Sequence, residues 1–317
     1  MSTSSPARTR LARAGRRALR GLAAVAALVL VLLGGVYALT ARRFTRHVAV
    51  PSHAAPSVAA LSPTPAAREA LVARGAHVVA VRGCTECHGA NFGGATIVDN
   101  PLIGRLGGPN LTAGGRGPAL DDRAWELALR HGVRPGGRPL LVMPSAEYAG
   151  MSDEDVAAVA AYVRSLRAVG TPSPALQPGP LLRVLYTAGK ADMVAAASMP
   201  QRTAHAAALA PAPTVAYGAY VATSCSGCHR ADFAGGPIAG APPDWPPAAN
   251  ITPHPTAGLG RWTAADFDRL LATGVRRDGR RVDTAGMPVR MTRALNDVER
   301  RALWAYLRTV PAKETLR

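Results

Sequence analysis

Two copies of one short motif supply side chains that could do chemistry. The pattern Cys-x-x-Cys-His occurs at residues 84–88 and again at residues 225–229. Thiols three residues apart can form thioether bonds with the two vinyl groups of one haem, and the adjacent His can ligate the iron. The sequence therefore predicts two covalently bound haem c groups. The expected attachment residues are Cys84, Cys87, Cys225 and Cys228, and the expected proximal iron ligands are His88 and His229.

Zinc sites and thioredoxin-like redox pairs also use closely spaced cysteines. A zinc site needs its two Cys-x-x-Cys halves about 12–20 residues apart, whereas these motifs start 141 residues apart, at Cys84 and Cys225. A thioredoxin-like pair does not require a His after the second Cys, yet a His follows it in both copies. The two motifs also contain all four cysteines of the chain, so none is left for a disulfide or a further ligand.

Each iron needs a second axial ligand opposite the His. Of the seven Met, only Met143 and Met287 occupy matching places, 55 and 58 residues after the haem His, and each precedes a Pro. A thioether ligand raises the reduction potential of haem iron, whereas the ordinary role of a Met is to fill gaps in a core. The repeated position favours the ligand interpretation. The fallback candidates, which have no matched partner, are Met151 and Met291.

The second half of the chain repeats the first at an offset of 140–144 residues. Apolar residues recur at helical spacing before each haem motif and near the end of each copy, and no alternating strand pattern of useful length appears. Thr263 with Asp266 predicts a capping box, and Gly132 and Gly274 predict helix ends. The expected fold is all-α, with two tandem haem-binding domains behind an N-terminal transmembrane helix. The matched pairs are His88 with His229, Asn110 with Asn250, Gly132 with Gly274, Met143 with Met287, and Tyr162 with Tyr306.

Residues 21–39 are uncharged and mostly apolar, which is long enough for a helix to cross the roughly 30 Å hydrocarbon core of a membrane. Six Arg precede this stretch and three follow it, so the positive-inside rule places the N-terminus in the cytoplasm and the haem domains on the periplasmic side of the inner membrane. A cleaved signal peptide would have a shorter apolar stretch of about 7–15 residues. We expect a retained single-pass anchor.

The net charge of +17 does not indicate nucleic-acid binding. Nine of these charges come from Arg within residues 1–46, which contain no acid, and two propionates on each haem would lower the remainder further. The expected organisation is a basic cytoplasmic tail (1–20), a transmembrane anchor (21–40), a Pro/Ala-rich tether (41–65), domain 1 (66–170), a linker (171–213) and domain 2 (214–317). Within the linker, residues 181–186 are apolar except for Arg183, which fits either a docking surface for a partner subunit or a cover over the seam between the domains.

Several other polar residues are weaker candidates. His131 and His254 have no counterpart in the other copy, so we expect them in loops or at the surface. The pairs Asn110 with Thr112 and Asn250 with Thr252 do recur. Their side chains could bond near a haem propionate or shape a turn. The remaining histidines lie outside the repeated loops, at His47, His53, His77 and His205.

The motifs together resemble a known family. In the second copy, the haem motif is followed by Asn-Ile-Thr-Pro at 250–253, Gly-Leu-Gly-Arg-Trp-Thr-Ala-Ala-Asp-Phe at 258–267, Gly-Val-Arg-Arg-Asp-Gly at 274–279 and Met-Pro at 287–288. This set resembles the cytochrome c subunits of membrane-bound alcohol, aldehyde and gluconate dehydrogenases, and the likeness covers roughly residues 66–310. It implies two tandem cytochrome c-type haem domains that take electrons from a dehydrogenase or another redox donor and pass them to a respiratory acceptor. Those subunits usually carry three haem domains, whereas this chain has two.

Two functions follow from the predicted ligands. If both irons have His and Met ligands, no open position remains for a substrate, so the chain transfers electrons between a dehydrogenase or other donor and the respiratory chain and is not itself an enzyme. A dihaem peroxidase, or a dihaem cytochrome that oxidises a small molecule, needs two unlike irons. The matched Met143 and Met287 favour the electron carrier.

Overall fold

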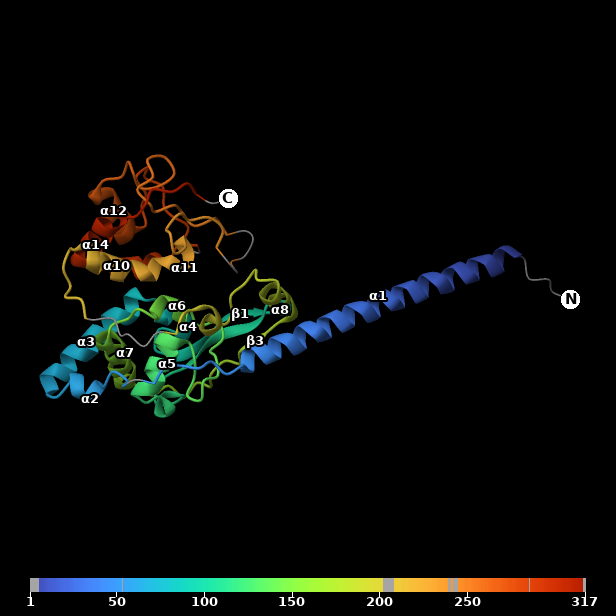
Figure 1. Cartoon of the computed structure of the whole chain (residues 1–317), viewed down its shortest axis with the longest axis horizontal. Helices are drawn as coiled ribbons and strands as arrows, with labels where there is room; N and C mark the ends of the chain where they lie inside the picture. Colours follow the sequence, from blue (N-terminus) through green and yellow to red (C-terminus); the bar gives the residue numbers. More distant parts are fainter. Residues whose placement is uncertain are drawn as a thin grey trace.

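The computed structural model describes residues 6–52, 54–201, 208–238, 241, 245–284 and 286–315, with side chains from residue 15 onward. A long helix, α1 (Pro6–Thr45), projects from two stacked groups of helices, each of which contains one haem motif (Figure 1). The first copy contains α2 (Val58–Leu61), α3 (Pro65–Val81), α4 (Cys84–His88), the 3-10 helix η1 (Gly117–Ala119), α5 (Asp122–His131), α6 (Ser145–Tyr148) and α7 (Asp153–Ser165). The second contains α10 (Val215–Ala222), the 3-10 helix η2 (Thr223–Cys225), α11 (Ser226–His229), α12 (Ala264–Thr273), α13 (Val289–Ala294) and α14 (Asp297–Leu307).

Helix α1 contains the apolar stretch. Within the described residues it is the one helix long and apolar enough to cross a membrane, and its candidate span, Gly15–Thr45, is not buried inside the protein. The predicted segment 21–39 lies wholly inside this helix.

The sequence signals for helix ends agree with the observed elements. Thr263 accepts a hydrogen bond from the backbone N–H of Asp266 at 3.1 Å, and the Asp266 carboxylate accepts one from the Thr263 N–H at 3.1 Å. This confirms the predicted capping box at the start of α12. Gly132 and Gly274 follow α5 and α12 with φ of 65° and 73°, a left-handed conformation that favours Gly at a helix C-terminus.

In each copy, the helix before the haem motif crosses the last helix at very short range. A Cβ atom on Gly75 of α3 would lie 2.0 Å from the carbonyl oxygen of Ala158 on α7. A Cβ atom on Gly218 of α10 would lie 1.9 Å from the carbonyl oxygen of Ala302 on α14. Only Gly permits backbones to approach this closely, so each crossing is fixed at its Gly.

A small sheet modifies the all-α prediction. Strands β1 (Gly93–Asn100) and β2 (Gly104–Asn110) form an antiparallel hairpin, and β3 (Gln177–Pro178) pairs with the start of β2. The sequence predicted no strand here. Glycine-rich strands have little side-chain alternation, and these pair through their backbones, so the period-2 signal on which strand prediction depends is absent. The haem-motif units themselves are helical, as predicted.

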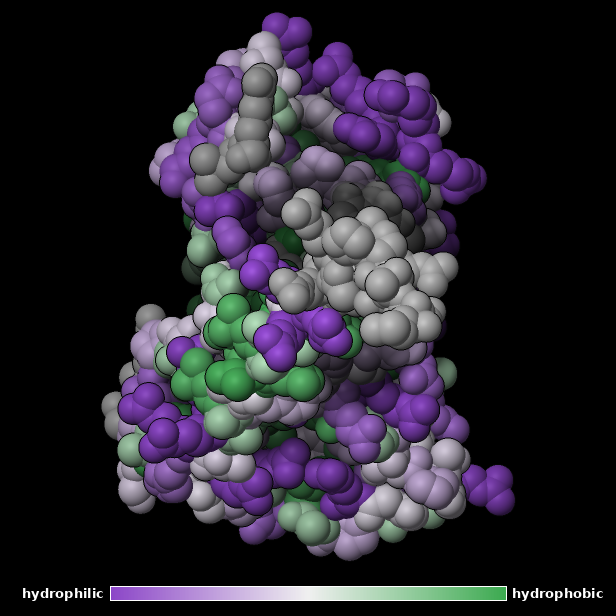
Figure 2. Space-filling model, turned by 90° about the vertical axis from the view of Figure 1, so that its right-hand side faces the viewer, coloured by the Kyte–Doolittle hydropathy of each residue, from purple (hydrophilic) through white to green (hydrophobic). Residues whose placement is uncertain are grey.

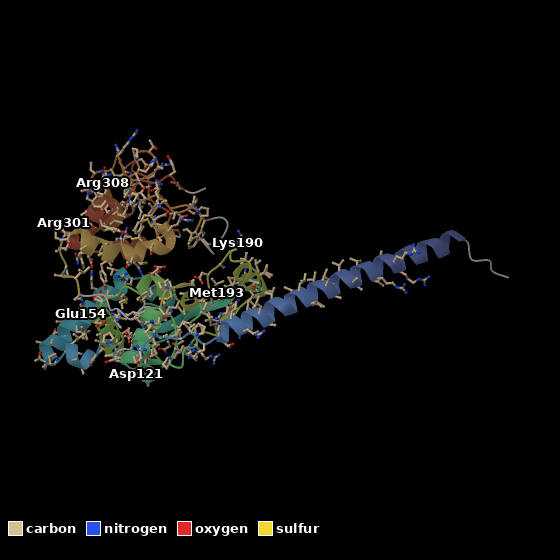
Figure 3. The ribbon with its side chains drawn as sticks, in the orientation of Figure 1. Asp121, Glu154, Lys190, Met193, Arg301 and Arg308 are labelled. Carbon is tan, nitrogen blue, oxygen red and sulfur yellow. The ribbon has the colours of Figure 1, made fainter. Side chains whose placement is uncertain are left out.

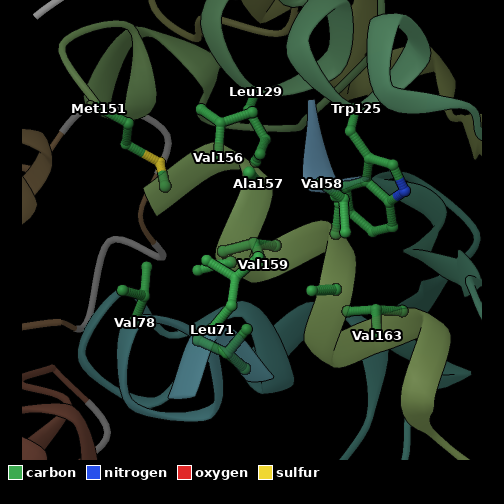
Figure 4. Packing of buried hydrophobic residues seen from close by; sticks show 14 of the residues in the cluster. Val58, Leu71, Val78, Trp125, Leu129, Met151, Val156, Ala157, Val159 and Val163 are labelled. Atoms are coloured by element: carbon green, nitrogen blue, oxygen red, sulfur yellow. The ribbon is translucent and has the colours of Figure 1, made fainter. Parts of the chain in front are cut away.

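Each copy has its own hydrophobic core. In the first, α7 lies at the centre and contributes Val156, Val159 and Val163, which pack with Leu71 of α3 and Trp125 of α5 (Figure 4). In the second, α14 has the same place, and Leu303 and Leu307 pack with Phe267 of α12 and Tyr217 of α10. Two separate cores built from matching helices are the expected outcome of an internal duplication.

The connection between the copies packs mainly on the first copy and on α1. Its helices are α8 (Pro180–Thr187) and α9 (Ala195–Ser198). Leu182, Met193 and Val194 form a cluster with Leu106 of β2 and Phe44 of α1. Met193 and Lys190 lie on the side of the molecule from which α1 projects (Figure 3). The apolar run 181–186 therefore lies against the C-terminal end of α1, rather than over the seam between the copies.

The two copies contact each other through equivalent positions. His77 on α3 corresponds to Tyr220 on α10, and Asp155 on α7 corresponds to Glu299 on α14. His77 Nε2 lies 2.7 Å from Glu299 Oε1, and the Tyr220 hydroxyl bonds to the Asp155 carboxylate. The position of His77 and Tyr220 in one copy thus contacts the position of Glu299 and Asp155 in the other, in both directions. Such reciprocal contacts are typical of a two-fold interface.

The hydrogen bond between His77 and Glu299 makes the stability contributed by this interface depend on pH. The bond to Glu299 raises the pKa of His77, against an opposing effect of burial, with the Asp155 charge adding to the rise and Arg74 opposing it. A His with a raised folded-state pKa stabilises the protein below its unfolded pKa of about 6.5, and the benefit is lost as pH rises through the folded pKa. Because the His77 side chain is 35% exposed, we expect its contribution to the free energy of unfolding to be below about 1 kcal/mol.

This expectation can be checked by thermal unfolding of the holoprotein across a pH series. The His77→Gln variant should be less stable than the wild type at acidic pH, and the difference should shrink as pH rises. Tyr220→Phe is the matched control, since it removes the equivalent contact with Asp155 without removing a His. A His77→Gln penalty that stays constant over the whole pH range would contradict the prediction.

Candidate functional site

Each haem motif lies at the start of a compact arrangement of aromatic rings. In the first copy, the ring of His88 stacks on Phe92 at 6.2 Å between centroids, and Phe92 meets Tyr162 edge-on at 6.1 Å. In the second, Phe233 meets Tyr306 edge-on at 5.9 Å. Phe92 and Phe233 both adopt positive φ, 58° and 60°, and residues in such conformations cluster at functional sites. The matched geometry holds the backbone after each motif in one conformation.

The two motif histidines are oriented by backbone carbonyls. His88 Nδ1 donates a hydrogen bond to the carbonyl of Pro109 at 3.0 Å, and His229 Nδ1 donates to the carbonyl of Ala249 at 2.7 Å. Burial lowers the pKa of both imidazoles, which favours the neutral form. With the proton on Nδ1, the Nε2 lone pair of each ring is available to a metal, as in metal-ligating His residues whose other ring nitrogen donates to a carbonyl.

In the second copy these side chains open onto an apolar cavity of about 470 Å³. Its lining includes Cys225, Cys228, His229 and Met287, with Leu271 and Leu303 from the core. Cavities that hold cofactors are commonly about 300–1,000 Å³ and mostly apolar. The residues present fit a haem: two thiols, an imidazole with a free Nε2, and a thioether share one apolar space.

In the first copy, Met143 and Cys84 both pack against the hydrophobic core. The residue before Met143 is Val142, whose φ of 68° is a conformation that β-branched residues rarely adopt. The Val142 N–H donates to the Met193 carbonyl at 2.8 Å, so the connection between the copies holds this loop. Strained backbone next to a candidate ligand is consistent with a functional position.

The fallback methionines have other surroundings. Met151 is almost completely buried in the first core (Figure 4). The sulfur of Met291 lies against the first copy, 2.5 Å from where a Cβ atom on Gly83 would be. Met291 also borders the second cavity, but it contacts the other copy, whereas Met287 keeps the place matched by Met143.

The recurring Asn-x-Thr segments act as structural turns. Asn110 Oδ1 accepts hydrogen bonds from the N–H and hydroxyl of Thr112, while its Nδ2 donates to the carbonyls of Val169 and Thr171. Asn250 bonds Thr252 in the same way and donates to the carbonyl of Lys313. Of the two predicted roles, these hydrogen bonds favour the turn, because each amide is occupied in tying the chain after the last helix to the haem loop.

One expectation about histidines is wrong. His131 is 2% exposed and bonds through Nδ1 to Gln201 at 2.8 Å, instead of lying at the surface. It occupies the last turn of amphipathic α5, whose inward face includes this position. His254 is partly exposed, with Nε2 3.0 Å from Glu314. His53 and His205 lie outside the described residues.

Sequence reasoning missed the residues through which each haem motif touches the other copy. Arg82 donates a hydrogen bond to the Thr223 hydroxyl at 2.6 Å. Each of these residues lies two positions before the first Cys of its haem motif. Arg290 of α13 donates to the Thr85 hydroxyl at 2.7 Å and pairs with Glu86 at 3.0 Å. No repeated pattern marks these side chains, because their counterparts differ in type.

The reciprocal contact comes from the first copy. Glu147 of α6 lies against Gly227 inside the second motif, where a Cβ atom would be 2.0 Å from Glu147 Oε1. Burial raises the pKa of Glu147 to about 7, with Arg82 opposing the shift. In each copy, the segment that follows the candidate Met ligand therefore meets the haem motif of its neighbour.

Comparison with known proteins agrees with this geometry. The cytochrome c family model matches residues 72–167 and 215–311. The chain is 29% identical to the cytochrome c subunit of a quinone alcohol dehydrogenase from Gluconacetobacter polyoxogenes, over 80% of this chain and 58% of that protein. It is 29% identical to a fructose dehydrogenase cytochrome subunit from Gluconobacter japonicus, over 79% of this chain and 55% of that protein.

A third relative is the gluconate 2-dehydrogenase cytochrome c subunit from Pantoea cypripedii, 28% identical over 78% of this chain and 61% of that protein. The chain spans a little over half the length of these curated relatives. Two matched segments, each with a Cys-x-x-Cys-His motif on the same helical frame, place it in one family. The chain belongs to the cytochrome c family, whose domains bind haem c covalently and transfer electrons.

Proposed function

We propose that the chain is a membrane-anchored dihaem c-type cytochrome that transfers electrons between a dehydrogenase and a respiratory acceptor. The single observation that carries this proposal is the duplicated set of Cys, His and Met side chains on matching frames, in the second copy around one apolar cavity. Haem c supplies a one-electron couple when bound. The residues that would bind the haems through thioethers are Cys84, Cys87, Cys225 and Cys228, and those that would ligate the irons are His88, Met143, His229 and Met287.

The protein's own residues orient and enclose the ligands. The carbonyls of Pro109 and Ala249 fix the two imidazoles. The apolar walls of the second cavity exclude water, and a buried thioether ligand favours the reduced iron. If His and Met ligated both irons, no position would be left open for a substrate, so we assign the chain a carrier function rather than catalysis.

Two features support a relay inside one chain. Arg82 and Thr223 join the residues just before the two haem motifs, and Arg290 and Glu147 connect each motif to the opposite copy. The copies are thus docked with their attachment motifs at the shared interface. This arrangement suits transfer from one centre to the other within the docked chain.

We further propose that α1 anchors the chain in the inner membrane, with both haem domains on the periplasmic side. The apolar residues 21–39 lie within one exposed helix, and the flanking Arg residues set the orientation. The relatives' names make a dehydrogenase that oxidises an alcohol, a sugar or a sugar acid the donor class to test first.

Native membranes that contain the full-length chain provide the test of this function. Adding an alcohol, fructose or gluconate should reduce the c-type haem, seen as growth of its reduced α-band, and membranes from cells that lack the chain should lose this signal. Purified reduced chain should not turn over hydrogen peroxide. Rapid peroxide turnover, or no haem reduction by any of these donors, would contradict the proposal.

A further inference from the structure

The C-terminal end of α1 and the helix packed beside it place apolar side chains where a membrane surface would lie. Arg183 of α8 donates to the Thr40 hydroxyl at 2.6 Å, and its guanidinium lies 4.4 Å from the centre of the Tyr37 ring. Phe44 of α1 contacts Tyr186 of α8 at 5.5 Å between centroids. Helix α8 is therefore fixed against residues 37–44 of α1.

This position sets the depth of α8 relative to the apolar stretch. Residues 21–39 form a helix of about 28 Å at 1.5 Å per residue, which fills the hydrocarbon core. Tyr37 falls at the end of that stretch, so α8 lies at the boundary between hydrocarbon and headgroups. Aromatic and basic side chains are typical of this boundary, and here they are Tyr37, Arg42, Arg43, Phe44, Arg183 and Tyr186.

Three large apolar side chains beside this junction are exposed. Leu181 and Val184 of α8 are 41% and 38% exposed, and Leu102 in the turn between β1 and β2 is 58% exposed. The Leu181 N–H donates to the Leu102 carbonyl at 3.0 Å, which ties the turn to α8. Figure 2 views the molecule from the side to which α1 projects.

We propose that Leu102, Leu181 and Val184 form a membrane collar that inserts into the headgroup region of the bilayer around the base of α1. The inference rests on the proposed anchoring by α1. The occupant is lipid because the collar is continuous with the transmembrane segment through Arg183, Thr40 and Tyr37. Exposed Lys190, on the same side of the molecule, supplies a positive charge for the headgroups (Figure 3). Insertion restrains the tilt of the haem domains, which a single helix followed by a free tether would leave unrestrained.

Site-directed spin labelling of the full-length holoprotein in liposomes of neutral and anionic phospholipid tests the collar. One added Cys carries a nitroxide in each variant: Leu181→Cys, Val184→Cys, Val29→Cys within α1, and Val215→Cys as an apolar control on α10 that is 45% exposed. Accessibility to oxygen relative to a water-soluble nickel chelate measures depth. We expect this ratio at 181 and 184 to be several-fold above that at 215 and below that at 29.

The labels distinguish failure of the collar from failure of the anchor. A deep label at 29 with labels at 181 and 184 that match 215 would overturn the collar and leave the anchor intact. A water-exposed label at 29 would overturn both. Because the liposomes contain no other protein, lipid contact at 181 and 184 cannot arise from a partner subunit. A collar that served only to bind such a partner would leave both labels in water.

Discussion

The Met287→His variant should lower the reduction potential of one haem by a few tenths of a volt, because axial ligands set haem potentials over a range of about 0.8 V. A thioether stabilises iron(II), whereas an imidazole donates more strongly and stabilises iron(III). His is close to Met in length, so the ligand can change without emptying the position. Spectroelectrochemical titration of the full chain should show one wave moved to low potential and the other nearly unmoved. Met143→His should move the other wave.

The fallback methionines provide the matched controls. Met291 borders the same cavity as Met287, and Met151 lies in the core of the first copy. The control variants are Met291→Leu and Met151→Leu. Both should leave the potentials close to those of the wild type. If Met291→Leu shifts a potential while Met287→His does not, Met291 is the ligand of the second copy and the Met-Pro assignment is wrong.

The Gly75→Ala variant should destabilise the first copy by about 3 kcal/mol or more, at the upper end of the usual cost of overpacking. The added Cβ would lie 2.0 Å from the Ala158 carbonyl oxygen, so α3 and α7 must separate. Gly218→Ala should do the same to α10 and α14, where the distance is 1.9 Å. Since whole domains are stable by about 5–15 kcal/mol, a large share of the stability is lost.

Denaturant unfolding of the holoprotein, followed by far-ultraviolet circular dichroism and by the haem spectrum, measures this loss. Gly170→Ala is the control, because a Cβ atom there meets nothing within 4 Å. Equal unfolding midpoints for Gly75→Ala and Gly170→Ala would show that the crossing can relax without cost. In that case the close approach of the helices would not explain why Gly occupies both positions.

The sequence was most informative where chemistry or helix geometry imposes a pattern. The haem motifs, the Thr263 capping box and the Gly132 stop signal depend on local spacing, and the Met-Pro positions on the internal repeat. Both kinds of pattern can be read without coordinates. The cap and the stop are confirmed. The ligand assignment stays a prediction, supported in the second copy by the cavity that Met287 shares with His229.

Features that depend on contacts between distant segments could not be predicted. The hairpin of β1 and β2 lacks side-chain alternation, and β3 pairs with it from about seventy residues away. His131 was assigned to the surface because it has no counterpart, yet burial depends on the face of α5 that it occupies. Arg82, Glu147 and Arg290 carry no signal at all, since their role depends on how the second copy docks onto the first.

The two-fold contact between the copies is the contact that a homodimer of single-haem chains would make. Joining two such chains through the connection at 171–213 replaces a bimolecular encounter by an intramolecular one, so the pair stays docked at any protein concentration. Fusion also allows the two halves to differ in sequence. His77 has an imidazole that can titrate near neutral pH, whereas its counterpart Tyr220 has a phenol. Arg82 donates a hydrogen bond to Thr223, the residue that occupies the equivalent position in the second copy. A symmetric dimer could not change one half without the other, whereas in this chain the surroundings of each haem motif can differ.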